Sequence, residues 1–198
     1  METRPLRRDA AANRERVLAA AAEVFHEQGL SAGLDDVAKH AGVGVGTVYR
    51  RFPSRDALLE ALLTELLQVH LDEAQAALAL PAGAGLAAYV RRLGEVQATP
   101  RGCAIRLWSS PSVEAQRDRV TAALAALLED AKQHGTCRAA ITVEDVVGIL
   151  VALRGVRESI TTTVALDWRR HLELCLAGLR PEGAGPDGSA AESTSPRG

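Results

Sequence analysis

The chain has 198 residues, a formal net charge of -2, and 47% hydrophobic and 24% charged residues, which is ordinary for a globular protein with a sizeable core. Charged residues interrupt every apolar stretch, so we expect no membrane-spanning segment and no secretory signal at the N-terminus. The three cysteines show no paired spacing, which argues against a disulfide framework. The five histidines show no ligand spacing, so we expect no metal and no other cofactor.

Abundant alanine, leucine, glutamate and arginine, with no convincing strand, predict an all-α fold of about nine helices. Apolar residues recur at three- and four-residue spacing in the first helix, and Gly29 is its expected left-handed stop. Ser54, Asp167 and the pair Thr142 and Asp145 are expected to cap later helices. The helices are expected at about 9–26, 34–40, 45–52, 55–78, 86–98, 103–109, 112–134, 142–161 and 167–176.

Two short helices joined by a tight turn lie within LDDVAKHAGVGVGTVYRRFPSR, residues 34–55, which is the length pattern of a helix-turn-helix. Gly42 permits the turn, and Val48 is expected to pack the second helix onto Val37 and Ala38 of the first. The alternative of a phosphate loop for GVGVG lacks a preceding strand and a following Lys-Ser/Thr pair. The outward side of the second helix would then carry small residues, Thr47, Tyr49 and arginines, which suits a DNA groove.

The run AGVGVGTVYRRFPSRDALLEALL, preceded by NRERVLAAAAEVFHEQG, resembles the TetR (tetracycline-repressor-like) family of bacterial transcriptional regulators over about residues 7–65. Residues 135–150 and the ending RRHLELCLAGLRP resemble the C-terminal domains of the SbtR-like group. The resemblance implies an all-helical homodimer with an N-terminal three-helix DNA-binding domain. The implied division is 1–56 for a helix-turn-helix domain with a basic N-terminal arm, 57–180 for a larger helical ligand-binding and dimerisation domain, and 181–198 for a disordered tail.

Carried over by resemblance, Thr47 and Tyr49 match the family's DNA-contacting pair, and Arg51 and Arg55 match phosphate-contacting positions. Gly33 stands where the family usually has a capping Ser or Thr, so that phosphate contact is expected to be absent. Two alternatives stay open for the basic arm and for Lys39, which either contact DNA or remain solvated. The predicted DNA-binding residues are Arg8, Lys39, Val45, Gly46, Thr47, Tyr49, Arg50, Arg51 and Arg55.

The effector site is predicted less sharply, because its candidates are apolar helix positions for which plain core packing is the alternative. Few aromatics and no acidic cluster favour an aliphatic or mixed ligand over a polycyclic cation, and Trp108 is the strongest single candidate. The predicted ligand-binding residues are Leu66, His70, Tyr89, Leu93, Trp108, Val120, Leu124 and Leu127. The predicted anchors of the dimer interface are Val147, Leu150, Val151, Leu172 and Leu176.

These patterns predict a cytoplasmic, ligand-responsive regulator that binds a pseudo-palindromic operator as a homodimer, most simply as a repressor. Its expected partners are double-stranded DNA, a second copy and a small-molecule effector, with no membrane and no enzymatic activity. Two other classes stay open: a helical ligand-binding protein that has lost DNA binding, and a small helical enzyme. Cys103 is either a small buried hydrophobe or a redox sensor.

Overall fold

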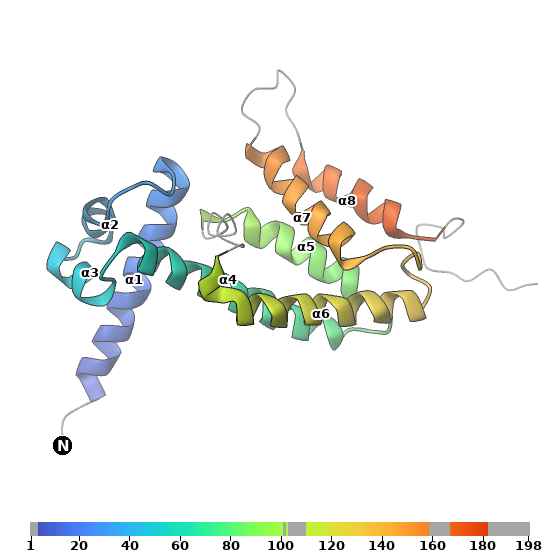
Figure 1. Ribbon diagram of the computed structural model, residues 1–198, viewed down its shortest axis with the longest axis horizontal. Coiled ribbons are helices and arrows are strands. Elements are labelled where there is room, and N and C mark those ends of the chain that lie inside the picture. The colour runs from blue at the N-terminus through green and yellow to red at the C-terminus, as the bar shows by residue number, and fades with distance from the viewer. Residues whose placement is uncertain (1–3, 101, 103–109, 159–166, 182–198) are drawn as a thin grey trace, which may run out of the picture.

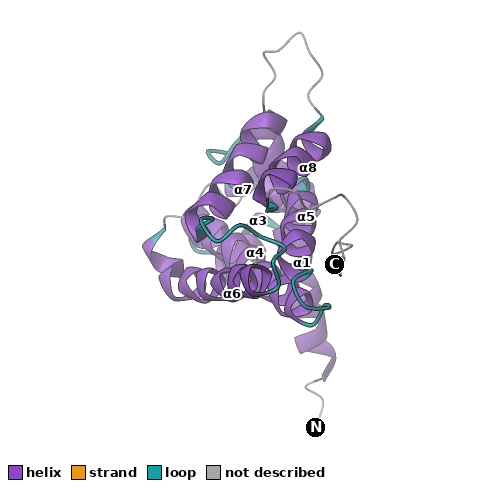
Figure 2. Cartoon of the chain, turned by 90° about the vertical axis from the view of Figure 1, so that its right-hand side faces the viewer, coloured by secondary structure: helices purple, strands orange, loops and turns teal. Residues whose placement is uncertain are grey.

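The computed structural model describes residues 4–100, 102, 110–158 and 167–181, and their side chains from residue 11 to residue 157 and from 167 to 181 within those ranges. This part of the chain contains helices and loops and no strand, which confirms the all-α prediction (Figure 2). The predicted helix 103–109, the end of the predicted helix 142–161 and the tail 182–198 lie outside the described residues. The elements are α1 (Arg4–Gln28), α2 (Leu34–Ala41), α3 (Val45–Arg51), α4 (Arg55–Leu78), α5 (Gly85–Gln97), a short 3₁₀ helix (Pro111–Val113), α6 (Glu114–Gln133), α7 (Val143–Glu158) and α8 (Trp168–Leu179).

The helices form two groups that the long helix α4 connects (Figure 1). Helices α1, α2 and α3 gather at one end, and we call them the head. Helices α5 to α8 form the other group, which we call the body, and α6 packs along α4. Helix α4 packs against both groups and is the element that connects them.

Helix α1 begins at Arg4, five residues before its predicted start at residue 9. The residues ahead of position 9 include Pro5, which an α-helix tolerates in its first turn because the amide there has no intrahelical partner. The backbone of the expected basic arm is therefore helical from Arg4 onward, and the prediction of a later start was wrong.

The predicted helix caps are present. Gly29 and Gly42 have φ values of 87° and 64°, the left-handed conformation expected at helix ends. The Ser54 hydroxyl accepts a hydrogen bond from the Ala57 amide at 3.1 Å. Asp167 Oδ1 accepts from the Arg169 amide at 2.9 Å and from the Arg170 amide at 3.3 Å, so it caps α8. The reciprocal bonds of a capping box join Thr142 and Asp145 at the start of α7.

Two hydrophobic clusters hold the protein together. The first contains the head, the α4 residues from Leu58 to Leu71, and two side chains from the start of the α6 region, Val113 and Val120. The second contains the α4 residues Ala74 and Ala77 together with α5, the rest of α6, α7 and α8. The core of the head therefore continues into α4, against which the start of the α6 region packs.

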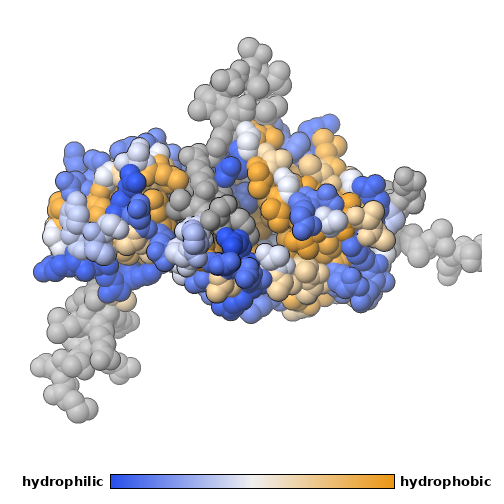
Figure 3. All heavy atoms as spheres, viewed as in Figure 1, coloured by the Kyte–Doolittle hydropathy of each residue, from blue (hydrophilic) through white to orange (hydrophobic). Residues whose placement is uncertain are grey.

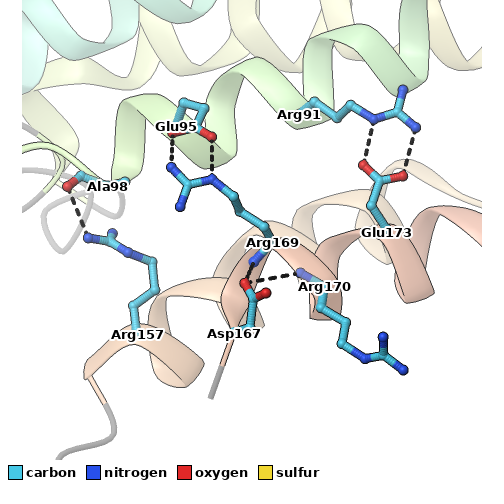
Figure 4. A network of polar contacts seen from close by, with 8 residues as sticks. All are labelled: Arg91, Glu95, Ala98, Arg157, Asp167, Arg169, Arg170 and Glu173. Atoms are coloured by element: carbon cyan, nitrogen blue, oxygen red, sulfur yellow. Dashed lines mark hydrogen bonds and ion pairs between the residues drawn. The ribbon is translucent and has the colours of Figure 1, made fainter. Parts of the chain in front are cut away.

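Polar contacts tie α8 and the end of α7 to α5 (Figure 4). Arg91 donates two hydrogen bonds to Glu173, at 2.6 and 2.9 Å, and Arg169 donates two to Glu95, at 2.9 and 3.0 Å. Arg157 donates to the carbonyl oxygens of Gln97 and Ala98, which end α5. The hydrogen bonds from Arg91 lower the pKa of the Glu173 carboxyl. Exposed pairs contribute little stability, but their bidentate geometry fixes the orientation of α8 on α5.

Candidate nucleic-acid interface

Helices α2 and α3 are held together by small apolar side chains, as the sequence predicts. Val37, Ala38 and Val48 are fully buried, and Val43 packs against the same cluster. The Val43 amide donates to the Ala38 carbonyl at 3.1 Å across the turn that contains Gly42. This packing leaves the other side of α3 open to solvent.

The exposed side of α3 combines aliphatic, aromatic and cationic groups without a carboxylate. Val45 and Tyr49 are 42% and 48% exposed, and Gly46, Arg50 and Arg51 are also exposed. A Cβ built on Gly46 would meet no atom within 4 Å, so packing inside the chain does not require glycine there. The missing side chain instead lets a partner approach the helix backbone closely, as the floor of a DNA groove would.

Thr47 and Arg50 are joined by a hydrogen bond in which Arg50 Nη2 donates to Thr47 Oγ1 at 3.2 Å. Because the threonine oxygen accepts this bond, its own hydrogen is available to a further acceptor such as a phosphate oxygen. A guanidinium and a hydroxyl set one helical turn apart suit the sugar-phosphate backbone.

Two residues of α1, Asn13 and Arg14, share a pocket with α3 and are not among the residues predicted from the sequence. The pocket has a volume of about 270 Å³ and is lined by Asn13, Arg14, Val17, Thr47, Arg50 and Arg51. Asn13 and Arg14 precede Val17 by one helical turn, and Val17 is buried in the head. That spacing puts them on the rim of the same helix face, which is the signal that could have identified them.

The remaining predicted DNA-binding residues lie at the margins of this surface. Lys39 is exposed in the last turn of α2. Arg55 begins α4 and lies 3.5 Å from the carboxylate of Asp56. Gly33 caps α2 without a side-chain hydrogen bond, so the position offers no hydroxyl to a phosphate. The backbone of Arg8 lies in α1, but its side chain is outside the described residues.

The predicted ligand-binding residues that the structure describes are all buried, and they are divided between the two clusters. Leu66 and Val120 lie in the cluster shared with the head, whereas Tyr89, Leu93, Leu124 and Leu127 lie in the cluster of the body. His70 is only 3% exposed, and this burial lowers its pKa to about 4. Its imidazole is therefore neutral at physiological pH. Trp108 and Cys103 lie outside the described residues.

A groove of about 460 Å³ lies between α5 and α8, away from the predicted ligand-binding residues. The face of Trp168 lines it, and the guanidinium of Arg169 lies 4.5 Å from the centre of that ring. The ion pairs between Arg91 and Glu173 and between Arg169 and Glu95 involve the same residues that line the groove. Four of its charged groups therefore pair with one another, and Arg92 pairs with Glu73.

Three of the predicted dimer-interface residues lie in the core of the chain itself. Leu150, Leu172 and Leu176 are at most 8% exposed and pack between α5, α7 and α8. Their burial satisfies the apolar periodicity within one protomer and leaves little of these side chains exposed to a partner, and their assignment as anchors stays a prediction. Val147 is partly buried against the same cluster, and Val151 alone among the five is exposed.

The sides of α7 and α8 that face away from the core expose apolar groups among charged ones, and we call them the α7–α8 face. Val151 and Leu174 are 54% and 62% exposed, and Figure 3 shows apolar surface over this part of the body. Gly148, Gly155 and Gly178 are also exposed, and a Cβ on each would meet no atom within 4 Å. A surface of exposed aliphatic side chains and open glycines suits close approach by another helix.

The described residues contain no group of three His, Cys, Asp or Glu side chains able to hold a metal ion. No helix among them is long and apolar enough to cross a membrane.

Comparison with known proteins gives two family matches that cover most of the chain. Residues 17–62 match the family described as "Bacterial regulatory proteins, tetR family". Residues 81–181 match the family described as "Transcriptional regulator SbtR-like, C-terminal domain". The first match includes the helix-turn-helix and the start of α4, and the second includes α5 to α8.

Individual relatives agree with these matches. A TetR transcription regulatory protein from Mycobacterium vanbaalenii is 30% identical, with a TM-score of 0.64 over 89% of this chain and 100% of that one. The regulator SCO0520 from Streptomyces coelicolor is 33% identical, with a TM-score of 0.58 over 85% of this chain and 99% of that one. The HTH-type transcriptional regulator YvdT from Bacillus subtilis (strain 168) is 43% identical over 60 residues, which span 31% of its length and 30% of this chain.

Proposed function

The chain belongs to the TetR family of bacterial transcriptional regulators, and from this premise we propose that it represses transcription by binding a pseudo-palindromic operator as a homodimer. The exposed side of α3 is the observation that supports DNA binding most directly. It carries Tyr49, Arg50 and Arg51 beside the open backbone at Gly46. Residues 1–56 would act as the DNA-binding domain, with Arg8, Lys39 and Arg55 as further contacts to phosphate.

Each recognition helix would lie in a major groove, where Val45 meets base edges and Thr47, Tyr49 and Arg51 meet the flanking phosphates. Because Val45 is apolar, the direct contact it offers is to a thymine methyl group. Sequence preference would otherwise depend on Arg50 and on the shape of the DNA.

Dimerisation would use the α7–α8 face, with Val151 and Leu174 at its centre. Glycines at positions 148, 155 and 178 would let the helices of two protomers approach closely. The two heads would then read half-sites about one helical turn apart. Residues 57–180 would therefore supply both the interface and the effector site.

The effector site would lie in the body, where α4, α5 and α6 pack together. Leu66, His70, Tyr89, Leu93, Val120, Leu124 and Leu127, with Trp108, remain its candidate lining. Neutral His70 among aliphatic side chains favours an uncharged aliphatic or mixed ligand. A ligand releases the operator only if it binds the DNA-incompetent spacing of the heads more tightly than the competent one.

Because its target is chromosomal DNA, the regulator would act in the bacterial cytoplasm. Membership of a family of regulators, rather than of enzymes, supports a binding function over a catalytic one.

The direct test is to select an operator from a pool of random duplexes with the full-length protein and to measure its affinity at several salt concentrations. We expect one enriched pseudo-palindrome, bound by two chains, with an affinity that falls steeply with salt. Tyr49→Ala should weaken binding to every duplex. If the protein enriches no sequence and binds no duplex at low salt, it is a helical ligand-binding protein without a DNA function.

A further inference from the structure

The pocket between α1 and α3 is built from groups that bind anions. Arg14 from α1 and Arg50 and Arg51 from α3 bring three guanidinium groups to its lining, and no carboxylate lines it. The Asn13 amide and the Thr47 hydroxyl add uncharged donors. Val17, only 2% exposed, closes the inner end. Its volume of about 270 Å³ is sufficient for a tetrahedral phosphate group with its first oxygen contacts.

The pocket lies beside α3, the helix proposed to enter the major groove. Thr47, Arg50 and Arg51 belong to both the pocket and α3, so the pocket lies beside the residues that would enter the major groove. A sugar-phosphate strand borders a major groove on each side. A helix seated in the groove would therefore bring a phosphate to the gap between α3 and α1.

Arg14 also contacts the connecting helix. Its Nη1 lies 2.6 Å from Oε1 of Glu65 in α4, and the two side chains are 34% and 22% exposed. A guanidinium has five N–H donors in a planar fork, so one bond to Glu65 leaves others that can reach a phosphate. The ion pair thus holds the Arg14 side chain in position at the pocket.

We propose that the pocket between α1 and α3 holds one backbone phosphate of the DNA, and that Arg14 is a DNA-binding residue. This inference rests on the proposed function and adds a contact from α1 to those on α3 and α4. In this complex, Arg14 and Arg50 bind the phosphate oxygens from opposite walls of the pocket, and Thr47 donates its hydroxyl hydrogen to the same group.

The test compares the full-length wild type with Arg14→Gln and Glu65→Gln on the operator selected by the wild type. Both substitutions remove the ion pair between α1 and α4, but only Arg14→Gln removes the proposed phosphate contact. We expect Arg14→Gln to weaken binding about tenfold and to reduce the slope of log affinity against log salt by about 0.9 for each half-site, or about 1.8 for the dimer. Glu65→Gln should keep the wild-type slope, and so should Arg14→Lys, which preserves the charge.

A second measurement uses the unmodified protein and DNA in which single phosphates are replaced by neutral methylphosphonates. At one position in each half-site, neutralisation should weaken the wild type but should not weaken Arg14→Gln further. Thermal unfolding of each variant checks that the head is folded.

The inference is overturned if Arg14→Gln keeps the wild-type salt slope, or if Glu65→Gln reduces affinity and slope as much as Arg14→Gln does. The second result would show that the ion pair matters only for the position of α1. A wild type that selects no operator would instead contradict the proposed function itself.

Discussion

Two exposed surfaces of this protein contain similar apolar groups but differ in charge. The outer side of α3 exposes Val45 and an open glycine at position 46, and the α7–α8 face exposes Val151 and open glycines such as Gly148. The exposed arginines of α3 have no carboxylate on their helix, whereas α8 carries Glu173 beside its exposed Arg169 and Arg170, and Arg169 is paired with Glu95. The first is therefore suited to a polyanion with a shaped groove, and the second to a copy of itself.

The comparison shows that exposed aliphatic residues and glycine do not identify a partner by themselves. They permit close approach, and the charge around them decides which partner gains from that approach. Phosphates release counterions when arginines bind them, whereas a charge buried between two protomers without a partner is strongly destabilising. The same small residues can thus serve DNA at one end of the molecule and a protein at the other.

The comparison is tested most severely by adding cationic side chains at the exposed apolar positions of the α7–α8 face. In the double variant Val151→Arg, Leu174→Arg, four arginines would meet at the proposed interface without partners. We expect the dimer to dissociate and operator affinity to fall by more than about a hundredfold, because each head would then bind alone. Sedimentation and fluorescence anisotropy measure the two effects. Thr121→Arg, on an exposed position of α6, is the matched control; a double variant that stays dimeric would show that the interface lies elsewhere.

Both surfaces depend on a folded chain. Acid should lower the stability of this fold through His70 on α4. Burial lowers the pKa of His70 to about 4, so the unfolded chain, whose histidine titrates near 6.5, binds more protons in between. Stability should therefore fall as the pH drops from about 6.5 to about 4, by about 3 kcal/mol in total for this residue. Urea unfolding at pH 7 and pH 5 should show a larger loss for the wild type than for His70→Gln. Equal losses would mean that the imidazole takes up no proton on unfolding, because it is already protonated in the folded chain at pH 5.

On the charged surface, the aromatic side chain is the next group to remove. Tyr49→Ala takes away a 48% exposed ring and its hydroxyl, and should reduce affinity about tenfold on all duplexes alike. Tyr49→Phe separates the hydroxyl from the ring. A loss confined to one operator sequence would indicate base readout rather than a phosphate contact, and electrophoretic mobility shifts on several duplexes would reveal it.

The smallest expected effect comes from Val45, an exposed valine like Val151 on the α7–α8 face. Val45→Ala removes two methyl groups from the outer side of α3 and should reduce discrimination for thymine at one operator position by a few-fold, about 1 kcal/mol. The salt dependence should not change, since no charge is altered. A changed salt slope would show that the variant disturbs the arginines nearby.

The head could be predicted from sequence in more detail than the body. Gly42, Val48 and Ser54 each perform a local task that residue type and spacing reveal, and the structure places them as expected. Leu150 and Leu172 show the limit of the same reasoning, because periodicity marks an apolar face without saying whether its cover is the chain's own α5 or a second copy. Arg14 was missed for a related reason: its neighbours on α3 come from a different part of the sequence.

The cluster that joins the head, the start of α4, Val113 and Val120 affects how the protein can be divided. A fragment ending at residue 56 would lack these valines and the α4 leucines, and would expose the apolar groups they cover. The cluster that buries the apolar groups of the head therefore extends beyond the residues proposed to touch DNA. Exchange of heads between related regulators, by recombination or by design, should therefore keep the start of α4 together with the head that packs on it.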